Sequence, residues 1–158
     1  MKALLRNALP FFPATLAAYI VGAALATQVT LNGVAAHGIR VSLDDRLYAT
    51  GYDLLGLART YLPLVAIAFL IALPTAAGLA RWLPQLRLVL YGLAGAAALV
   101  VLHLVARKVL GVTALAATRE FSGVLFQAVA GWFGGYVYFV ATGWAHRPGP
   151  SPDAPRRA

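Results

Sequence analysis

The chain has 158 residues, of which 61% are hydrophobic and only 11% are charged, with a net charge of +8. Soluble domains carry about a quarter charged residues, so this composition excludes an ordinary soluble globular protein. The absence of cysteine excludes disulfides, thiolate metal ligands and a cysteine nucleophile. The basic residues flank apolar segments and form no basic helix, so we expect no nucleic acid among the partners.

Four segments of about twenty residues contain no Asp, Glu, Lys or Arg. A helix rises about 1.5 Å per residue, so each segment is long enough to cross a hydrocarbon core of about 30 Å. We therefore predict an all-α fold, a four-helix transmembrane bundle in a single membrane domain covering residues 1–145. The predicted spans are approximately residues 10–28, 61–80, 88–106 and 123–144.

The first span follows two basic residues, Lys2 and Arg6, and its small residues Ala24 and Ala26 resemble a signal-peptide cleavage site. Its apolar run is longer than the apolar region of a typical signal peptide. We therefore expect an uncleaved first span.

The connection between the first two spans, about residues 29–60, contains a predicted helix start. Ser42 is a good N-cap, and Asp44 and Asp45 would lie in the first turn, where the positive end of the helix dipole favours acids. A second cap pattern at residues 50–53 predicts the lead-in to the second span. We predict a short interfacial helix in this first outer loop, because three apolar residues fall on one side of it: Leu43, Leu47 and Tyr48.

The same connection holds the densest group of polar residues in the chain. Two adjacent Asp with a His could bind a divalent cation or act in general acid–base chemistry. The spacing selects no metal, however, and adjacent residues point in different directions on a helix. Helix capping and charge pairing explain the group more simply, so we expect no catalytic residue and no metal site among its members: His37, Arg40, Asp44, Asp45, Arg46, Asp53 and Arg59.

Few polar residues lie at membrane depth, chiefly Gln28, His103 and Gln127. Because His103 is the only His within a span, haem ligation by two histidines lacks its second ligand, and a proton relay lacks a buried acid. No nucleophile, phosphate-loop or HExxH motif is present. We therefore expect no cofactor and no enzyme activity.

Small residues recur at steps of four within the first and fourth spans. Such stripes let another helix backbone approach closely, which is how membrane helices gain van der Waals contact. Packing within the bundle is one interpretation, and an oligomer interface is the alternative. The stripe residues are Ala14, Ala18, Gly22 and Ala26 in the first span, and Gly131 and Gly135 in the fourth.

Basic residues also gather at the predicted outer ends of the spans. The second and fourth spans begin on that side, so their positive dipole ends point outward. One hypothesis is that this face contacts an anion, most simply a phospholipid headgroup, and a solvated basic rim is the alternative. The residues concerned are Arg40, Arg46, Arg59, Arg107, Lys108 and Arg119.

The orientation follows from the basic residues flanking the spans. Seven lie on the side of the N-terminus and six on the other, and the bases before the first span usually weigh most. We predict a multi-pass protein of a bacterial cytoplasmic (inner) membrane with both termini cytoplasmic, because the preference for Arg over Lys suggests a bacterial genome rich in G and C. Residues 146–158, rich in Pro and Arg, are predicted to be a disordered cytoplasmic tail.

These features favour a small, non-catalytic inner-membrane protein that oligomerises or serves as an accessory subunit of a membrane complex. Its expected partners are membrane lipid and either itself or another membrane protein. The alternative is an oligomeric transporter or channel for a lipid or small amphiphile, which predicts a cavity lined by Gln28, Asn32, His103 and Gln127. A third interpretation, a membrane enzyme, requires the acids of the first outer loop to converge with His37 or His103.

Overall fold

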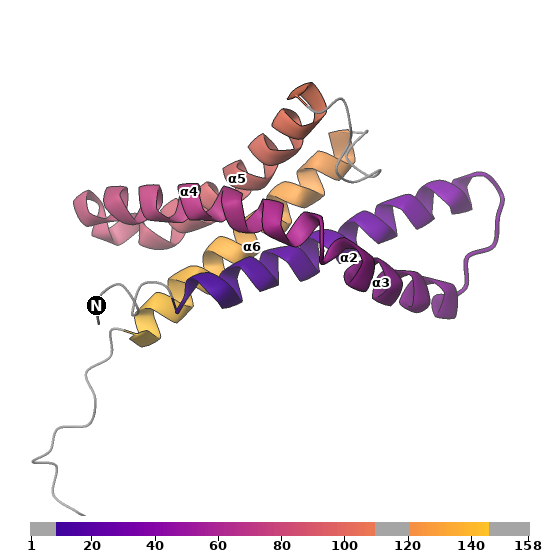
Figure 1. Ribbon diagram of the computed structural model, residues 1–158, viewed down its shortest axis with the longest axis horizontal. Coiled ribbons are helices and arrows are strands. Elements are labelled where there is room, and N and C mark those ends of the chain that lie inside the picture. Colours follow the sequence, from indigo (N-terminus) through magenta and orange to yellow (C-terminus); the bar gives the residue numbers. More distant parts are fainter. Residues whose placement is uncertain (1–8, 110–120, 146–158) are drawn as a thin grey trace, which may run out of the picture.

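The computed structural model describes residues 9–109 and 121–145, and all the regular elements in these ranges are helices. In chain order they are α2 (Phe11–Ala36), α3 (Leu43–Leu57), α4 (Tyr61–Trp82), the 3-10 turn η1 (Pro84–Leu86), α5 (Arg87–Val109) and α6 (Phe121–Ala145) (Figure 1). Helices α2, α4 and α6, and the segment from η1 through α5, are long and apolar enough to cross a membrane. For these described ranges, this confirms an all-helical fold with four candidate spans. The predicted tail, Lys2, Arg6 and Arg119 lie outside the described residues.

Prolines mark several of the helix boundaries, although Pro74 lies inside α4. Pro13 and Pro63 are each the third residue of a helix, where a missing N–H costs nothing and the fixed φ suits the first turn. At the other end of α4, Pro84 opens η1 directly after the C-cap Leu83. This tight turn sends α5 back alongside α4.

Helix α6 packs against α5 through bare backbone. A Cβ placed on Gly131 would lie 2.2 Å from the carbonyl oxygen of Gly95, and a Cβ on Gly135 would lie 2.0 Å from that of Tyr91. Only a hydrogen atom fits at these positions, so the two helices touch more closely than side chains would allow.

An adjoining side of α6 meets α2 and α4. A Cβ on Gly134 would lie 2.7 Å from Ala18 Cβ and 2.7 Å from a ring carbon of Phe69. Phe69 is completely buried and is one of the largest side chains of the core. Helix α6 therefore lies between α5 and α2, with α4 closing the bundle against both α5 and α2.

Helix α2 extends beyond its predicted end at residue 28 and stops only at Ala36. It ends there because Gly38 adopts φ 84°, a left-handed conformation that glycine accepts, and its N–H bonds to the carbonyl of Ala35. Figure 1 shows the extension of α2 and the returning α3 as a helical hairpin that projects from the rest of the bundle.

Helix α3 begins at the predicted N-cap, and its capping box is complete. Ser42 Oγ accepts from the Asp45 N–H at 3.1 Å, and the Ser42 N–H donates to Asp45 Oδ2 at 2.9 Å. The second helix start predicted at residues 50–53 is wrong, since α3 continues through Leu57. Thr50 does not cap a new helix, because its hydroxyl donates to the carbonyl of Arg46 one turn earlier. The position of α3 in the membrane interface stays a prediction.

Replacing Gly135 with Ala should destabilise the bundle, because the added methyl group would force α6 away from the α5 backbone. Overpacking of this kind costs about 1–3 kcal/mol. Thermal unfolding in detergent, followed by circular dichroism, measures the effect. The matched control is Gly78→Ala on α4, where an added Cβ meets nothing within 4 Å. Equal melting temperatures for the two variants would contradict the tight α5–α6 contact.

Candidate functional site

A buried polar cluster joins all four candidate spans. The hydroxyl of Tyr61, the first residue of α4, donates to Gln127 Oε1 on α6 at 2.7 Å. Gln127 Nε2 donates in turn to the carbonyl of Gly22 on α2 at 2.9 Å. His103 on α5 stacks on the Tyr61 ring with centroids 5.7 Å apart, and its Nε2 lies 3.4 Å from the Tyr61 hydroxyl.

The geometry of this cluster selects one histidine tautomer. The Tyr61 hydroxyl already donates its proton to Gln127, so it can only accept from His103. A hydrogen bond between the two therefore requires a proton on His103 Nε2. His103 Nδ1 is then a bare acceptor, and it is buried with no hydrogen-bond partner among the described residues. Tyr61, His103 and Gln127 are 1%, 3% and 0% exposed, so water and substrates have no access to the cluster. This arrangement links the four candidate spans through buried side chains.

Glycine is required at position 22 for the same cluster. A Cβ there would lie 2.8 Å from Gln127 Oε1 and 3.2 Å from the Tyr61 hydroxyl. The small residues predicted as a packing stripe on the first span therefore also make room for the side chains of Gln127 and Tyr61. Its residues Ala14, Ala18, Gly22 and Ala26 are buried within a single chain, as are Gly131 and Gly135 on α6.

A second polar network holds α3 against the outer part of α2. Arg46 donates to Gln28 Oε1 at 2.8 Å and to Asn32 Oδ1 at 3.0 Å. Gln28 Nε2 donates to the Thr50 hydroxyl at 3.0 Å. These polar side chains of α3 thus face the protein, as do Leu54 and Leu57, which pack against the core, whereas five other large apolar side chains face outward. These exposed side chains are Leu43, Leu47, Tyr48, Tyr52 and Leu55.

The acids of the first outer loop do not converge. Asp45 accepts from Ser42, Asp53 accepts from the Thr27 hydroxyl at 2.8 Å, and Asp44 is exposed. His37 bonds to the carbonyl of Gly33 on its own helix. Within residues 9–109 and 121–145, no group of three His, Cys, Asp or Glu residues could hold a metal ion. The convergence that an enzyme in this loop requires is absent from the described residues.

The basic residues predicted for the outer side occupy separate places. Arg46 is engaged with α2, as described above, whereas Arg40 lies in the α2–α3 loop and Arg59 between α3 and α4. Arg107 and Lys108 lie in the last turn of α5. The described members of this group therefore lie on several different segments, and a lipid contact there stays a prediction.

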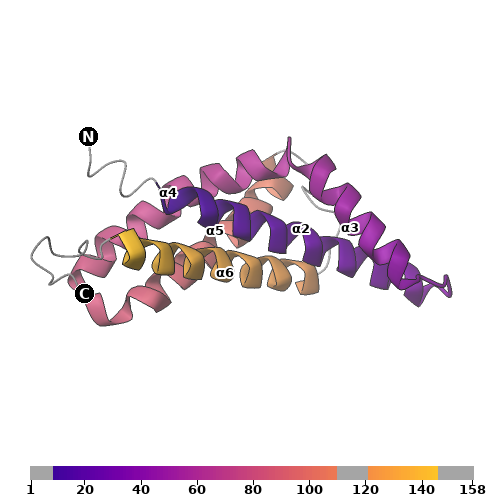
Figure 2. The same cartoon turned by 90° about the horizontal axis from the view of Figure 1, so that it is seen from below.

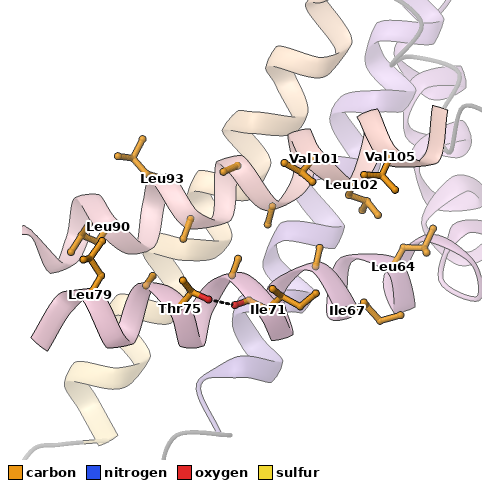
Figure 3. Close-up of a pocket in the computed structure, with 16 residues that line it drawn as sticks. Leu64, Ile67, Ile71, Thr75, Leu79, Leu90, Leu93, Val101, Leu102 and Val105 are labelled. Atoms are coloured by element: carbon orange, nitrogen blue, oxygen red, sulfur yellow. Dashed lines mark hydrogen bonds between the residues drawn. The ribbon is translucent and has the colours of Figure 1, made fainter. Parts of the chain in front are cut away.

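An open apolar groove of about 660 Å³ runs between α4 and α5 (Figure 3). The one polar side chain in its lining is that of Thr75, whose hydroxyl donates to the Ile71 carbonyl of the same helix at 2.8 Å. The lining therefore presents no other polar side chain to which a polar ligand could bond. Large side chains such as Ile67 and Leu93 are 58% and 54% exposed beside it. The lining residues are Leu64, Ile67, Ala68, Ile71, Ala72, Thr75, Ala76, Leu79, Leu90, Leu93, Ala94, Ala97, Ala98, Val101, Leu102 and Val105.

Comparison with protein-family models, curated proteins and solved structures finds no match for this chain.

Sequence reasoning identified His103 and Gln127 but missed Tyr61, the residue that connects them. Tyrosine at the start of a span is typical of the membrane interface, where its amphipathic ring is favoured. Nothing in the local sequence distinguishes that role from an inward-facing hydroxyl. Only the packing of α4 against α2 and α5 turns Tyr61 into the bundle.

Replacing Tyr61 with Phe should lower the free energy of unfolding by about 1–2 kcal/mol, because Gln127 Oε1 loses its donor while the ring still packs. Thermal unfolding in detergent measures the change. Tyr52→Phe is the matched control, since that side chain is 70% exposed. A Tyr61→Phe variant as stable as the control would contradict the role of the cluster.

The two hydrogen bonds from Ser42, first that of the side chain and then that of the backbone, hold the pKa of Asp45 below its ordinary value. A lowered carboxyl pKa adds stability to the start of α3 above the ordinary Asp pKa, and this stability is lost as the pH falls through the lowered value. Carbon-13 NMR of the Asp45 carboxyl measures the titration. We expect Ser42→Ala to raise the Asp45 pKa, and an unchanged titration would contradict the capping geometry.

Proposed function

We propose that the protein is a non-catalytic membrane protein that acts as a self-associating subunit, with the α4–α5 groove as the surface that receives a second copy. The single observation that carries this proposal is the groove itself. Six alanines among its lining residues let a neighbouring backbone come close, as the glycines do between α5 and α6.

The length of the groove matches a helix. Its lining on α4 runs from Leu64 to Leu79, fifteen residues apart, or about 22 Å at the helical rise. That is most of the thickness of a hydrocarbon core. A transmembrane helix could therefore lie along it over about four turns.

The same chain presents a ridge that complements the groove. Large side chains on α6 fall within one face of the helix, because they are spaced by three and four residues. Each is at least 38% exposed in the described part of the chain: Leu125, Val129, Trp132, Phe133 and Tyr136. Inserting the ridge of one copy into the groove of the next makes a heterologous contact that closes into a ring or extends into a chain.

The transporter alternative is less well supported. It requires a cavity lined by Gln28, Asn32, His103 and Gln127, but the first two bond to Arg46 and the last two are sealed around Tyr61. Gln28 and Asn32 thus belong to the α2–α3 network, whereas His103 and Gln127 belong to the enclosed cluster. The two pairs do not line a common cavity in the described part of the chain.

We also propose the finer placement of the chain in a bacterial inner membrane, with both termini cytoplasmic and α3 on the outer side. The outward apolar side chains of α3, including Leu47 and Tyr48, suit a helix lying in the headgroup region.

Cysteine cross-linking in membranes tests the self-association directly, because the natural chain contains no cysteine. Copies carrying Ala97→Cys in the groove should form disulfide-linked dimers with copies carrying Val129→Cys on the ridge. Neither variant alone should do so. The control pair is Ala97→Cys with Ile20→Cys, whose side chain is exposed on α2.

Three outcomes would overturn the proposed contact. Cross-linking of Ala97→Cys with itself would indicate a groove-to-groove interface. A stoichiometric adduct with a different protein would make the chain an accessory subunit of that partner. The absence of any adduct, with lipid retained in the purified protein, would leave lipid as the occupant of the groove.

A further inference from the structure

A second hollow lies on a different face of the α4–α5 pair, beside the turn that joins the two helices. It measures about 360 Å³ and is lined by α4, the turn, α5 and the C-terminal part of α6. On α4, Arg81 belongs to this hollow and Leu79 to the apolar groove. At 100° per residue these two positions lie about 200° apart, so the two hollows are on opposite sides of the helix. The residues that line the second hollow are Ala77, Ala80, Arg81, Pro84, Arg87, Tyr91, Tyr138 and Thr142.

Unpartnered donors line this hollow. The Tyr91 and Tyr138 side chains are 3% and 6% exposed, and their rings meet edge to face with centroids 5.0 Å apart. Neither hydroxyl forms a hydrogen bond within residues 9–109 and 121–145, and neither oxygen is among the buried atoms without a partner, so both are accessible. Two phenolic O–H groups, one on α5 and one on α6, are therefore available to an occupant of the hollow.

The hollow also carries positive charge with no described counter-ion. Arg81 and Arg87 form no ion pair with any acid in the described ranges. The acids in those ranges, Asp44, Asp45 and Asp53, all lie on α3. Figure 2 shows α3 at one end of the molecule and the α4–α5 turn at the other.

The depth of the hollow matches the membrane boundary. Arg81 is the first charged residue after the apolar run of α4, and Arg87 is the last one before the apolar run of α5. Arginines at such positions reach the headgroup region, where anionic lipids concentrate negative charge. Guanidinium groups and hydroxyls are donors that match phosphate oxygens.

We propose that this hollow binds the phosphate of an anionic phospholipid headgroup, with Arg81 and Arg87 supplying charge and Tyr91 and Tyr138 donating hydrogen bonds. The site is separate from the predicted outer basic residues and does not depend on self-association through the groove. It would fix one lipid at the end of the bundle that is predicted to face the cytoplasm.

The test is lipid titration of the intact protein, purified in a mild detergent and followed by native mass spectrometry. Phosphatidylglycerol should bind saturably, and phosphatidylcholine with the same acyl chains should bind more weakly. Arg81→Gln together with Arg87→Gln should weaken phosphatidylglycerol binding roughly ten- to thirtyfold. The matched control removes the same charge from the predicted tail, with Arg156→Gln together with Arg157→Gln, and should bind like the wild type.

A second variant separates the pocket from general charge. Tyr138→Phe removes one hydroxyl and leaves the charge and the ring unchanged, and it should weaken phosphatidylglycerol binding roughly threefold or more. Binding unaffected by the arginine pair or by Tyr138→Phe would overturn the site. Equal binding of phosphatidylcholine would overturn the requirement for an anionic lipid. Displacement of phosphatidylglycerol by millimolar inorganic phosphate would make a free anion the occupant and overturn the lipid as its source.

Discussion

The close approach of α6 to α5 and α2 is the constraint on which the rest of the structure depends. Within a membrane, apolar surface gains little by leaving lipid, so helices associate where small residues allow backbone contact and where polar groups meet. Gly131 and Gly135 supply that contact towards α5, and Gly134 supplies it towards α2 and α4. Helix α6 is therefore held in one position among the other spans.

That position decides where Gln127 lies. Its amide reaches Gly22 on one side and Tyr61 on the other, and His103 stacks against the same tyrosine. An unpaired amide is costly in a low-dielectric interior, so this cluster favours a single arrangement of the four helices. Packing and hydrogen bonding thus support the same geometry. The polar side chains at the centre are engaged with one another, and the surfaces available to partners lie outside the cluster.

Some of this arrangement could be predicted from the chain, and particular residues show where prediction stops. The spans follow from runs without charge, and the start of α3 follows from Ser42 and its acids, because both signals are local. The lead-in predicted at residues 50–53 is wrong because Thr50 bonds to the backbone of its own helix, a choice that a cap pattern does not reveal. Tyr61 is buried, although a tyrosine at the start of a span equally suits the membrane interface, so its local sequence does not reveal its place.

The amino-acid sequence by itself determined that this chain is helical and apolar enough to cross a membrane four times, since hydropathy and helical rise are local properties. It also marked the small residues that allow close packing. Only the tertiary structure decided which helices use them, because glycine and alanine on a helix face are equally suited to contacts within the chain and between chains. The groove of α4 and α5 and the hollow beside Arg81 and Arg87 likewise arise from several helices together. No single segment of the sequence contains them.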